Sequence, residues 1–78
     1  MIEIAERITI DPNVCNGKPT IRGKRITAGT ILEFLSSGDS VKEILDQYPT
    51  LTEDDIYACL KFAKDLVERD YVVQQLAA

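Results

Sequence analysis

The first ten residues alternate between apolar and polar side chains. Isoleucines occupy positions 2, 4, 8 and 10, which is the period-two pattern of a half-buried strand. Asp11-Pro12-Asn13 then supplies the turn chemistry that ends such a strand. Two further extended pieces are predicted at residues 20–22 and 25–27, with Gly23 between them. We therefore predict two or three short strands around a loop within residues 1–27.

The apolar period changes to that of an α-helix after this loop. Ile31, Leu32 and Leu35 form one stripe, Thr27 is a suitable N-cap, and Gly38 stands where a C-terminal glycine is expected. A second helix is predicted to begin at a capping box, in which Ser40 and Glu43 have the required spacing. Its apolar face consists of Val41, Ile44, Leu45 and Tyr48, and Pro49 ends it.

The start of a third helix is marked by several signals at once. Thr52 is placed to cap it, Asp55 occupies the capping-box position, and Leu51 and Ile56 occupy the two staple positions. Three acids in the first turn suit the helix dipole. The apolar stripe continues through Leu60, Ala63 and Val67. The sequence leaves open whether residues 70–76 prolong this helix or form a fourth.

The second and third predicted helices, joined by residues 48–51, have the length and turn of a helix-turn-helix. Any small helical bundle uses similar short helices, so the pattern fits both a DNA-binding helix-turn-helix and an ordinary helical bundle. In a helix-turn-helix, the first residues of the second helix approach the base edges. Here those residues are Glu53, Asp54 and Asp55, whose carboxylates oppose attraction to phosphate. We therefore expect these acids to cap the helix rather than read DNA.

The chain is short, with 78 residues, of which 45% are hydrophobic and none is Trp. We expect a single domain, comprising extended strands and loop (1–27), a helical bundle (28–69, with the helix-turn-helix at 40–69) and a C-terminal helical extension (70–78). A chain of this size buries only about 60% of the surface of its unfolded form. The missing stability is expected to come from a second subunit, as a homodimer or with an obligate partner.

Several function classes are disfavoured by composition. The chain has no histidine, so it lacks Ser-His and Cys-His nucleophile pairs and Cys/His zinc sites. We expect neither an enzyme nor a cofactor or metal site. Met1 is not followed by a basic start and an apolar run, and no stretch reaches the roughly 18 apolar residues of a membrane helix. A cytoplasmic protein is therefore expected. In that compartment Cys15 and Cys59 are expected to be small buried thiols. The alternatives are a disulfide between them or a reactive Cys15.

Charge is distributed unevenly along the chain. The net charge is -4, yet residues 16–25 hold four of the nine basic residues and no acid. We call this segment the basic loop; its cations are Lys18, Arg22, Lys24 and Arg25. Glycine and proline between them shape the backbone for close approach to a partner. The basic loop is therefore the candidate contact for nucleic acid or another anionic surface, although ordinary solvated charge gives the same composition.

The order of motifs resembles a known family. Residues 8–26 read ITIDPNVCNGKPTIRGKRI and are followed by Ile31-Leu-Glu, Gly38-Asp-Ser and ILDQYP at residues 44–49. This string resembles the small prokaryotic family called domain of unknown function 433, over roughly residues 7–63. The resemblance implies a mostly α fold, in which short N-terminal strands precede a three- to four-helix, homeodomain-like helix-turn-helix bundle.

The same resemblance implies a role as the antitoxin of a two-gene toxin–antitoxin module, whose toxin is a PIN-like ribonuclease from the adjacent gene. An antitoxin of this kind would bind its toxin, would be a candidate to bind its own promoter DNA, and would carry toxin-binding elements at its C-terminus. The apolar residues there fit an amphipathic segment that docks into a groove or completes a dimer; they are Leu66, Val67, Tyr71, Val72, Val73 and Leu76.

Two hypotheses stay open from the sequence. In the first, a dimeric antitoxin contacts operator phosphates through its basic loops. In the second, the chain is a protein-interaction module without DNA binding, and its arginines pair with acids of the partner. The sequence also leaves open whether the N-terminal strands pair within one chain or across a dimer, and we favour pairing that helps to make the dimer.

Overall fold

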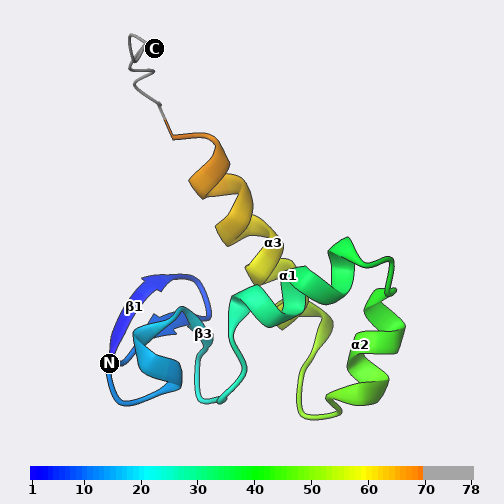
Figure 1. The fold of residues 1–78 in the computed structure, drawn as a ribbon, viewed down its shortest axis with the longest axis horizontal. Helices are drawn as coiled ribbons and strands as arrows, with labels where there is room; N and C mark the ends of the chain where they lie inside the picture. The colour runs from blue at the N-terminus through cyan, green and yellow to red at the C-terminus, as the bar shows by residue number, and fades with distance from the viewer. Residues whose placement is uncertain (70–78) are drawn as a thin grey trace, which may run out of the picture.

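A computed structural model describes residues 1–69 as a short antiparallel sheet followed by three helices (Figure 1). The strands are β1 (Ile2–Ala5), β2 (Ile8–Ile10) and β3 (Thr20–Ile21), in that order across the sheet. The helices are α1 (Ala28–Ser36), α2 (Val41–Gln47) and α3 (Glu53–Val67). A short turn of helix, η1 (Cys15–Gly17), lies between β2 and β3. The C-terminal extension predicted at 70–78 lies outside the described residues.

The predicted N-terminal strand is in fact a β-hairpin. β1 and β2 pair antiparallel, with Ile2 opposite Ile10, Glu3 opposite Thr9 and Ala5 opposite Ile8. They are joined by a turn at Glu6 and Arg7, where Arg7 has a φ of 64°. A continuous strand would need an apolar residue at position 6, and Glu6 breaks that alternation. The strands β1, β2 and β3 therefore pair with one another within one chain, and β1 lies at the edge of the sheet.

The helices begin at the predicted caps. The Thr27 side chain accepts a hydrogen bond of 3.0 Å from the Thr30 N–H, which caps α1. At α2 the capping box is complete, because the Ser40 Oγ accepts from the Glu43 N–H and the Glu43 carboxylate accepts from the Ser40 N–H, both at 3.1 Å. The hydrogen bonds from the Ser40 backbone and side chain lower the pKa of Glu43.

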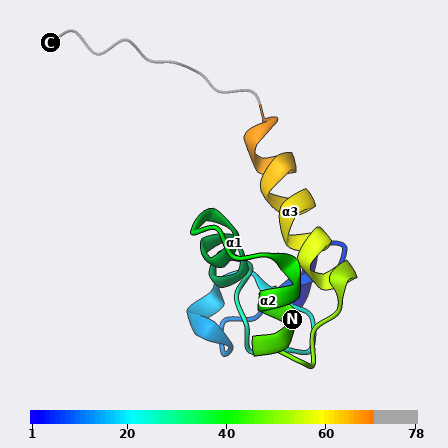
Figure 2. The ribbon, with the colours of Figure 1, turned by 90° about the vertical axis from the view of Figure 1, so that its right-hand side faces the viewer.

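The hydrophobic core lies between the sheet and the helices. Its buried members come from every main element except β1, and they are Ile8, Ile21, Ala28, Ile31, Ile44, Leu51, Ile56 and Cys59. The sheet is therefore part of the same core as the helices. α3 packs against α1, α2 and β2. Because core contacts reach α3 through Ile56 and Cys59, its first half is buried in the body, whereas its second half extends away from it (Figures 1 and 2).

The two cysteines are both free thiols, but only Cys59 is buried. The expectation that both would be buried is wrong for Cys15, which is half-buried because it lies in the loop segment η1. Burial raises the pKa of the Cys59 thiol to about 11, and the nearby Asp55 carboxylate adds to the rise.

This difference predicts unequal thiol reactivity. At pH 8 about one Cys59 thiol in a thousand is ionised, given its pKa of about 11, and the core also shields it. A disulfide reagent such as DTNB should therefore modify Cys15 rapidly, and Cys59 only after denaturant is added. Cys15→Ser should remove the rapid phase; two rapid thiols in the native protein would contradict this assignment.

Candidate interaction surfaces

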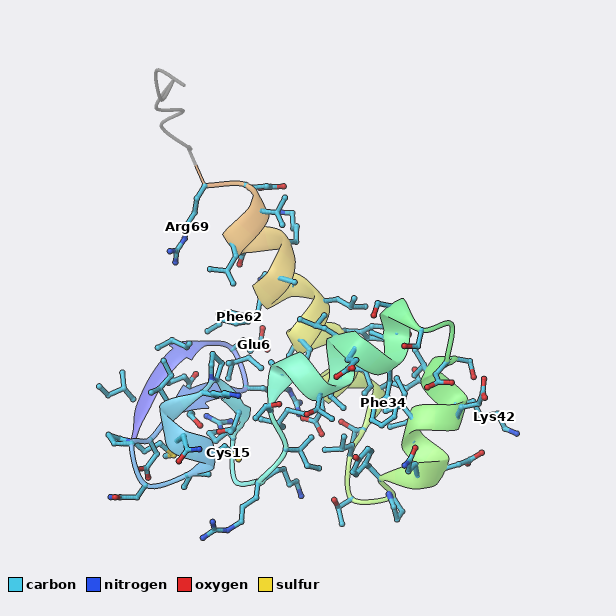
Figure 3. All side chains as sticks on the ribbon, in the orientation of Figure 1. Glu6, Cys15, Phe34, Lys42, Phe62 and Arg69 are labelled. Carbon is cyan, nitrogen blue, oxygen red and sulfur yellow. The ribbon has the colours of Figure 1, made fainter. Side chains whose placement is uncertain are left out.

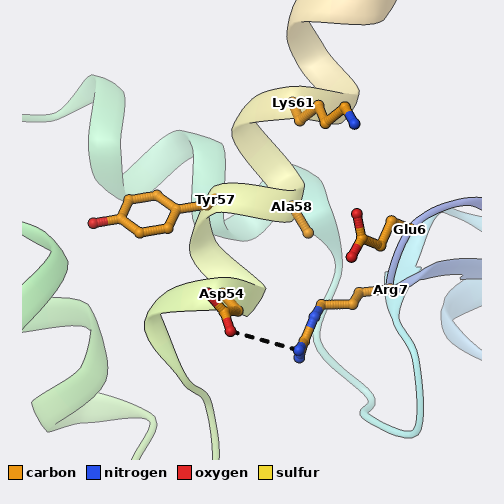
Figure 4. A pocket seen from close by; sticks show the side chains of 6 residues that line it. All are labelled: Glu6, Arg7, Asp54, Tyr57, Ala58 and Lys61. Atoms are coloured by element: carbon orange, nitrogen blue, oxygen red, sulfur yellow. Dashed lines mark ion pairs between the residues drawn. The ribbon is translucent and has the colours of Figure 1, made fainter.

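An ion pair joins the hairpin turn to the start of α3. The Arg7 Nη1 donates to Asp55 Oδ1 at 3.1 Å, and its Nη2 lies 3.6 Å from Asp54 Oδ2 (the Asp54 pair is drawn in Figure 4). The Asp55 side chain is only 9% exposed, whereas that of Asp54 is 73% exposed. Charge-assisted hydrogen bonds are stronger when solvent is excluded. The Arg7–Asp55 contact is therefore the stronger of the two.

Asp55 uses both of its carboxylate oxygens within the protein. While Oδ1 accepts from Arg7, Oδ2 accepts from the Thr52 N–H at 3.0 Å and from the Thr52 hydroxyl at 3.3 Å. This satisfies a backbone donor that the helix start would otherwise leave unpaired. The capping role predicted for this acid is confirmed. Its pairing with Arg7 was not predicted, although the interrupted alternation at Glu6 would have indicated a turn at this point.

A cleft separates the hairpin turn from the side of α3 that faces it. Its volume is about 250 Å³, and Figure 4 shows its lining residues Glu6, Arg7, Asp54, Tyr57, Ala58 and Lys61. A second cavity of about 150 Å³ shares Glu6, Ala58 and Lys61 with it and adds Ile4 and Phe62. Figure 3 shows Glu6 and Phe62 side by side. The hairpin turn thus lies beside the first turns of α3, on the side that bears Asp54, Ala58 and Lys61.

The structure does not gather the four cations of the basic loop at one place. Lys24 and Arg25 line the same cavity of about 190 Å³, on the side of the sheet that carries Thr9 and Thr20. Lys18 lines a different cavity of about 370 Å³, beside the first turn of α1.

Arg22 is engaged elsewhere in the protein. Its Nη1 forms an ion pair of 2.8 Å with Glu3 of β1, and its backbone N–H donates to the Arg7 carbonyl oxygen at 2.7 Å. Both side chains of the ion pair are about half exposed, so it contributes little to stability. It nevertheless removes one cation from the free charge of the basic loop, and leaves Lys18, Lys24 and Arg25 as the candidates for contact with an anionic partner.

The predicted C-terminal interface is described only in part. Val67 is 70% exposed and Leu66 is half-buried. Leu60 lies seven residues before Val67, is 42% exposed, and belongs to the same side of α3. Tyr71, Val72, Val73 and Leu76 lie outside the described residues. Figures 1 and 2 agree that this half of α3 extends from the body, so Leu60 and Val67 present an apolar stripe that the described residues do not cover.

Within residues 1–69, no three His, Cys, Asp or Glu side chains are grouped so that they could hold a metal ion. None of the helices α1 to α3 combines the length and the apolar character needed to cross a membrane.

Comparison with known proteins identifies the class. The sequence profile of a family described as protein of unknown function (DUF433) matches residues 8–63. A similar solved structure is that of a DUF433 member protein from Anabaena variabilis ATCC 29413, with 35% sequence identity and a TM-score of 0.74. The match covers 80% of this chain and 61% of that one. No curated protein matches the sequence.

This chain belongs to the DUF433 family, as its motifs indicated. Its family core starts at β2 and ends within α3. β1 and the last turn of α3 therefore lie outside the region that the family profile matches. Arg7 is the residue directly before that region.

The Arg7–Asp55 contact generates a stability prediction. Arg7→Ala removes the ion pair and keeps a side chain at a left-handed φ, and should lower the free energy of unfolding by about 1–2 kcal/mol. Arg7→Gly also removes the pair but relieves the backbone, and should recover about 1 kcal/mol of that loss. Urea unfolding followed by circular dichroism measures both.

The neighbouring exposed residue provides the control. Glu6→Ala should change the free energy of unfolding by no more than about 0.5 kcal/mol. If Arg7→Ala were as stable as the wild type, the ion pair would make no contribution to the free energy of unfolding, which would contradict the prediction.

Proposed function

We propose that this domain is the antitoxin of a two-gene toxin–antitoxin module and binds its PIN-like ribonuclease toxin through the second half of α3. The observation that supports protein binding is the stripe formed by Leu60 and Val67, which are 42% and 70% exposed on a helix that extends from the body (Figure 1). The antitoxin role rests on the family resemblance found in the sequence. The exposed stripe on α3 is the surface that we assign to this partner.

The mode of binding follows from the shape of α3. An amphipathic helix with apolar residues at i, i+3 and i+7 fits a hydrophobic groove. Leu60, Ala63 and Val67 have this spacing, and burying the two larger side chains supplies apolar contact of about 1–3 kcal/mol each. Polar and charged side chains, among them Lys64 and Glu68, which pair with each other at 3.3 Å, flank the stripe and keep it in register.

Promoter binding is a second part of this proposal and is assigned to the basic loop. Lys24 and Arg25 face one cavity, and a guanidinium can hold a phosphate in a bidentate manner. In this arrangement α2 and α3 form a homeodomain-like helix-turn-helix that supports the loop rather than reading bases. Because such binding rests on contacts between cations and phosphates, it would weaken as the salt concentration rises.

The alternative is a protein-interaction module without DNA binding. It is favoured by the start of α3, which opens with carboxylates, two of which, Asp54 and Asp55, pair with Arg7 of the neighbouring hairpin turn (Figure 4). In that case the cations of the basic loop pair with acids of the protein partner. The two versions share the α3 surface and differ only in the role of the loop.

A single charge on the α3 stripe tests the protein-binding role. Val67→Lys should weaken binding to the ribonuclease encoded by the adjacent gene by at least about tenfold, or about 1.4 kcal/mol, and should restore ribonuclease activity in a mixture of the two proteins. Calorimetric titration and RNA cleavage measure these effects.

Ile2→Lys is the matched control, because Ile2 is as exposed as Val67, 67% against 70%, but lies on β1. It should leave ribonuclease binding unchanged. A Val67→Lys chain that still inhibits the ribonuclease fully would contradict the proposed surface.

A gel-shift assay with the promoter DNA separates the two versions. If the loop binds phosphates, replacing Lys18, Arg22, Lys24 and Arg25 together by Ala should abolish the shift at low salt, while Arg22→Ala alone should have the smallest effect because that side chain already pairs with Glu3. If the variant with all four replacements shifted the DNA as the wild type does, contact with DNA through the loop would be excluded. A wild-type chain that gives no shift would support the interaction module without DNA.

A further inference from the structure

β1 is an edge strand with apolar side chains in solvent. It pairs with β2 on one side, and within residues 1–69 no strand lies on its other side. Met1, Ile2 and Ile4 are 76%, 67% and 41% exposed. An open edge presents unpaired backbone N–H and C=O groups that can pair with another strand. Proteins usually protect such edges with lysine, proline, charges, short strands or β-bulges. β1 has the sequence Ile-Glu-Ile-Ala, without lysine or proline, and its protection is limited to Glu3, its short length and the irregularity between Glu3 and Ala5.

We infer that β1 pairs antiparallel with β1 of a second copy of this chain, which joins two three-stranded sheets into one across a twofold axis. This goes beyond the proposed antitoxin role and does not depend on it, because the surface is separate from the α3 stripe. It also gives a location for the dimer expected from the small size of the chain.

The register of the pair follows from the faces of the strand. Ile2 lies opposite Ile10, and Ile4 lines a cavity together with Ala58 and Phe62 of α3, so both face the helices. Directly opposite residues of antiparallel strands point to the same face. A register shifted by one residue would therefore join the apolar face of one sheet to the polar face of the other. With Glu3 on the axis, each Ile2 lies opposite Ile4 of the second copy, and the strands overlap along their length.

The charges of the edge fit this self-pairing. Two Glu3 carboxylates would meet at the axis, which alone would be unfavourable. However, each is already bound to Arg22 at 2.8 Å. The dimer thus places two carboxylates between two guanidinium groups, with no net charge. Arg22 would then support an interface rather than contact DNA.

The contact is small, so the dimer should be weak. Stable complexes bury about 800 Å² per partner, and a four-residue strand covers less than that. We expect a dissociation constant on the order of micromolar to tens of micromolar. Sedimentation equilibrium over about 5–500 µM spans this range.

The first experiment compares two exposed apolar positions on different surfaces. Ile2→Lys should raise the dissociation constant of the dimer at least about tenfold, whereas Val67→Lys, at a similarly exposed position of α3, should leave it unchanged. Circular dichroism confirms that each variant is folded. A wild-type chain that stays monomeric at the highest concentration, or a dimer lost in Val67→Lys and kept in Ile2→Lys, would overturn the inference.

The register is tested by charge and by cross-linking. Arg22→Gln should weaken the dimer more than Arg25→Gln, since no ion pair among the described residues involves Arg25. In a Cys15→Ser background, Glu3→Cys should form a disulfide-linked dimer on mild oxidation, and Glu6→Cys should not. Equal effects of the two arginine changes, or cross-linking at position 6 rather than 3, would reject this register. Ribonuclease binding by Ile2→Lys is unaffected in either case, so failure of the dimer and failure of the antitoxin role give different results.

Discussion

The structure depends on the contact between Arg7 and Asp55, residues that are 48 positions apart in the sequence. Apolar burial holds the sheet and the helices in one core. The ion pair adds a directional contact between the hairpin turn and α3, because the guanidinium binds one carboxylate oxygen while Thr52 binds the other. One acid therefore caps α3 and attaches the hairpin turn to it. The left-handed backbone at Arg7, with a φ of 64°, is the conformational cost of this attachment.

This attachment divides α3 into two parts with different roles. Its first turn is bound to the hairpin turn, because Asp54 and Asp55 both pair with Arg7. Its second half extends outward with Leu60 and Val67 in solvent. α3, which is about 22 Å long, is thus bound to the body at its first end and exposed to solvent at its second. The basic loop divides its cations between two cavities and an ion pair with β1.

Much of the fold could be predicted from local chemistry. Thr27, Ser40 and Thr52 mark the starts of the three helices, and their stripes supply the core residues Ile31, Ile44 and Ile56. Such signals are readable because caps and apolar periods act over a few neighbouring residues. The family was recognised for the same reason, from one contiguous string of motifs.

The candidate sites were harder to predict, because they depend on contacts between distant segments. Four isoleucines suggested one strand, and only the chain's return at Glu6 and Arg7 makes it a hairpin. Nothing local to Arg22 indicates that it pairs with Glu3, 19 residues away. Charge density along the sequence therefore located the basic loop, but the tertiary structure decides which of its cations are free to bind.

A double-mutant cycle on Arg7 and Asp55 measures how strongly these two side chains depend on each other. The free energies of unfolding of the wild type, Arg7→Gln, Asp55→Asn and the double variant give the coupling between the two side chains. We predict a coupling of about 1–2 kcal/mol, and less than about 0.5 kcal/mol for the exposed pair of Arg7 with Asp54. A coupling near zero for Arg7 and Asp55, or a larger one for Asp54, would contradict this prediction.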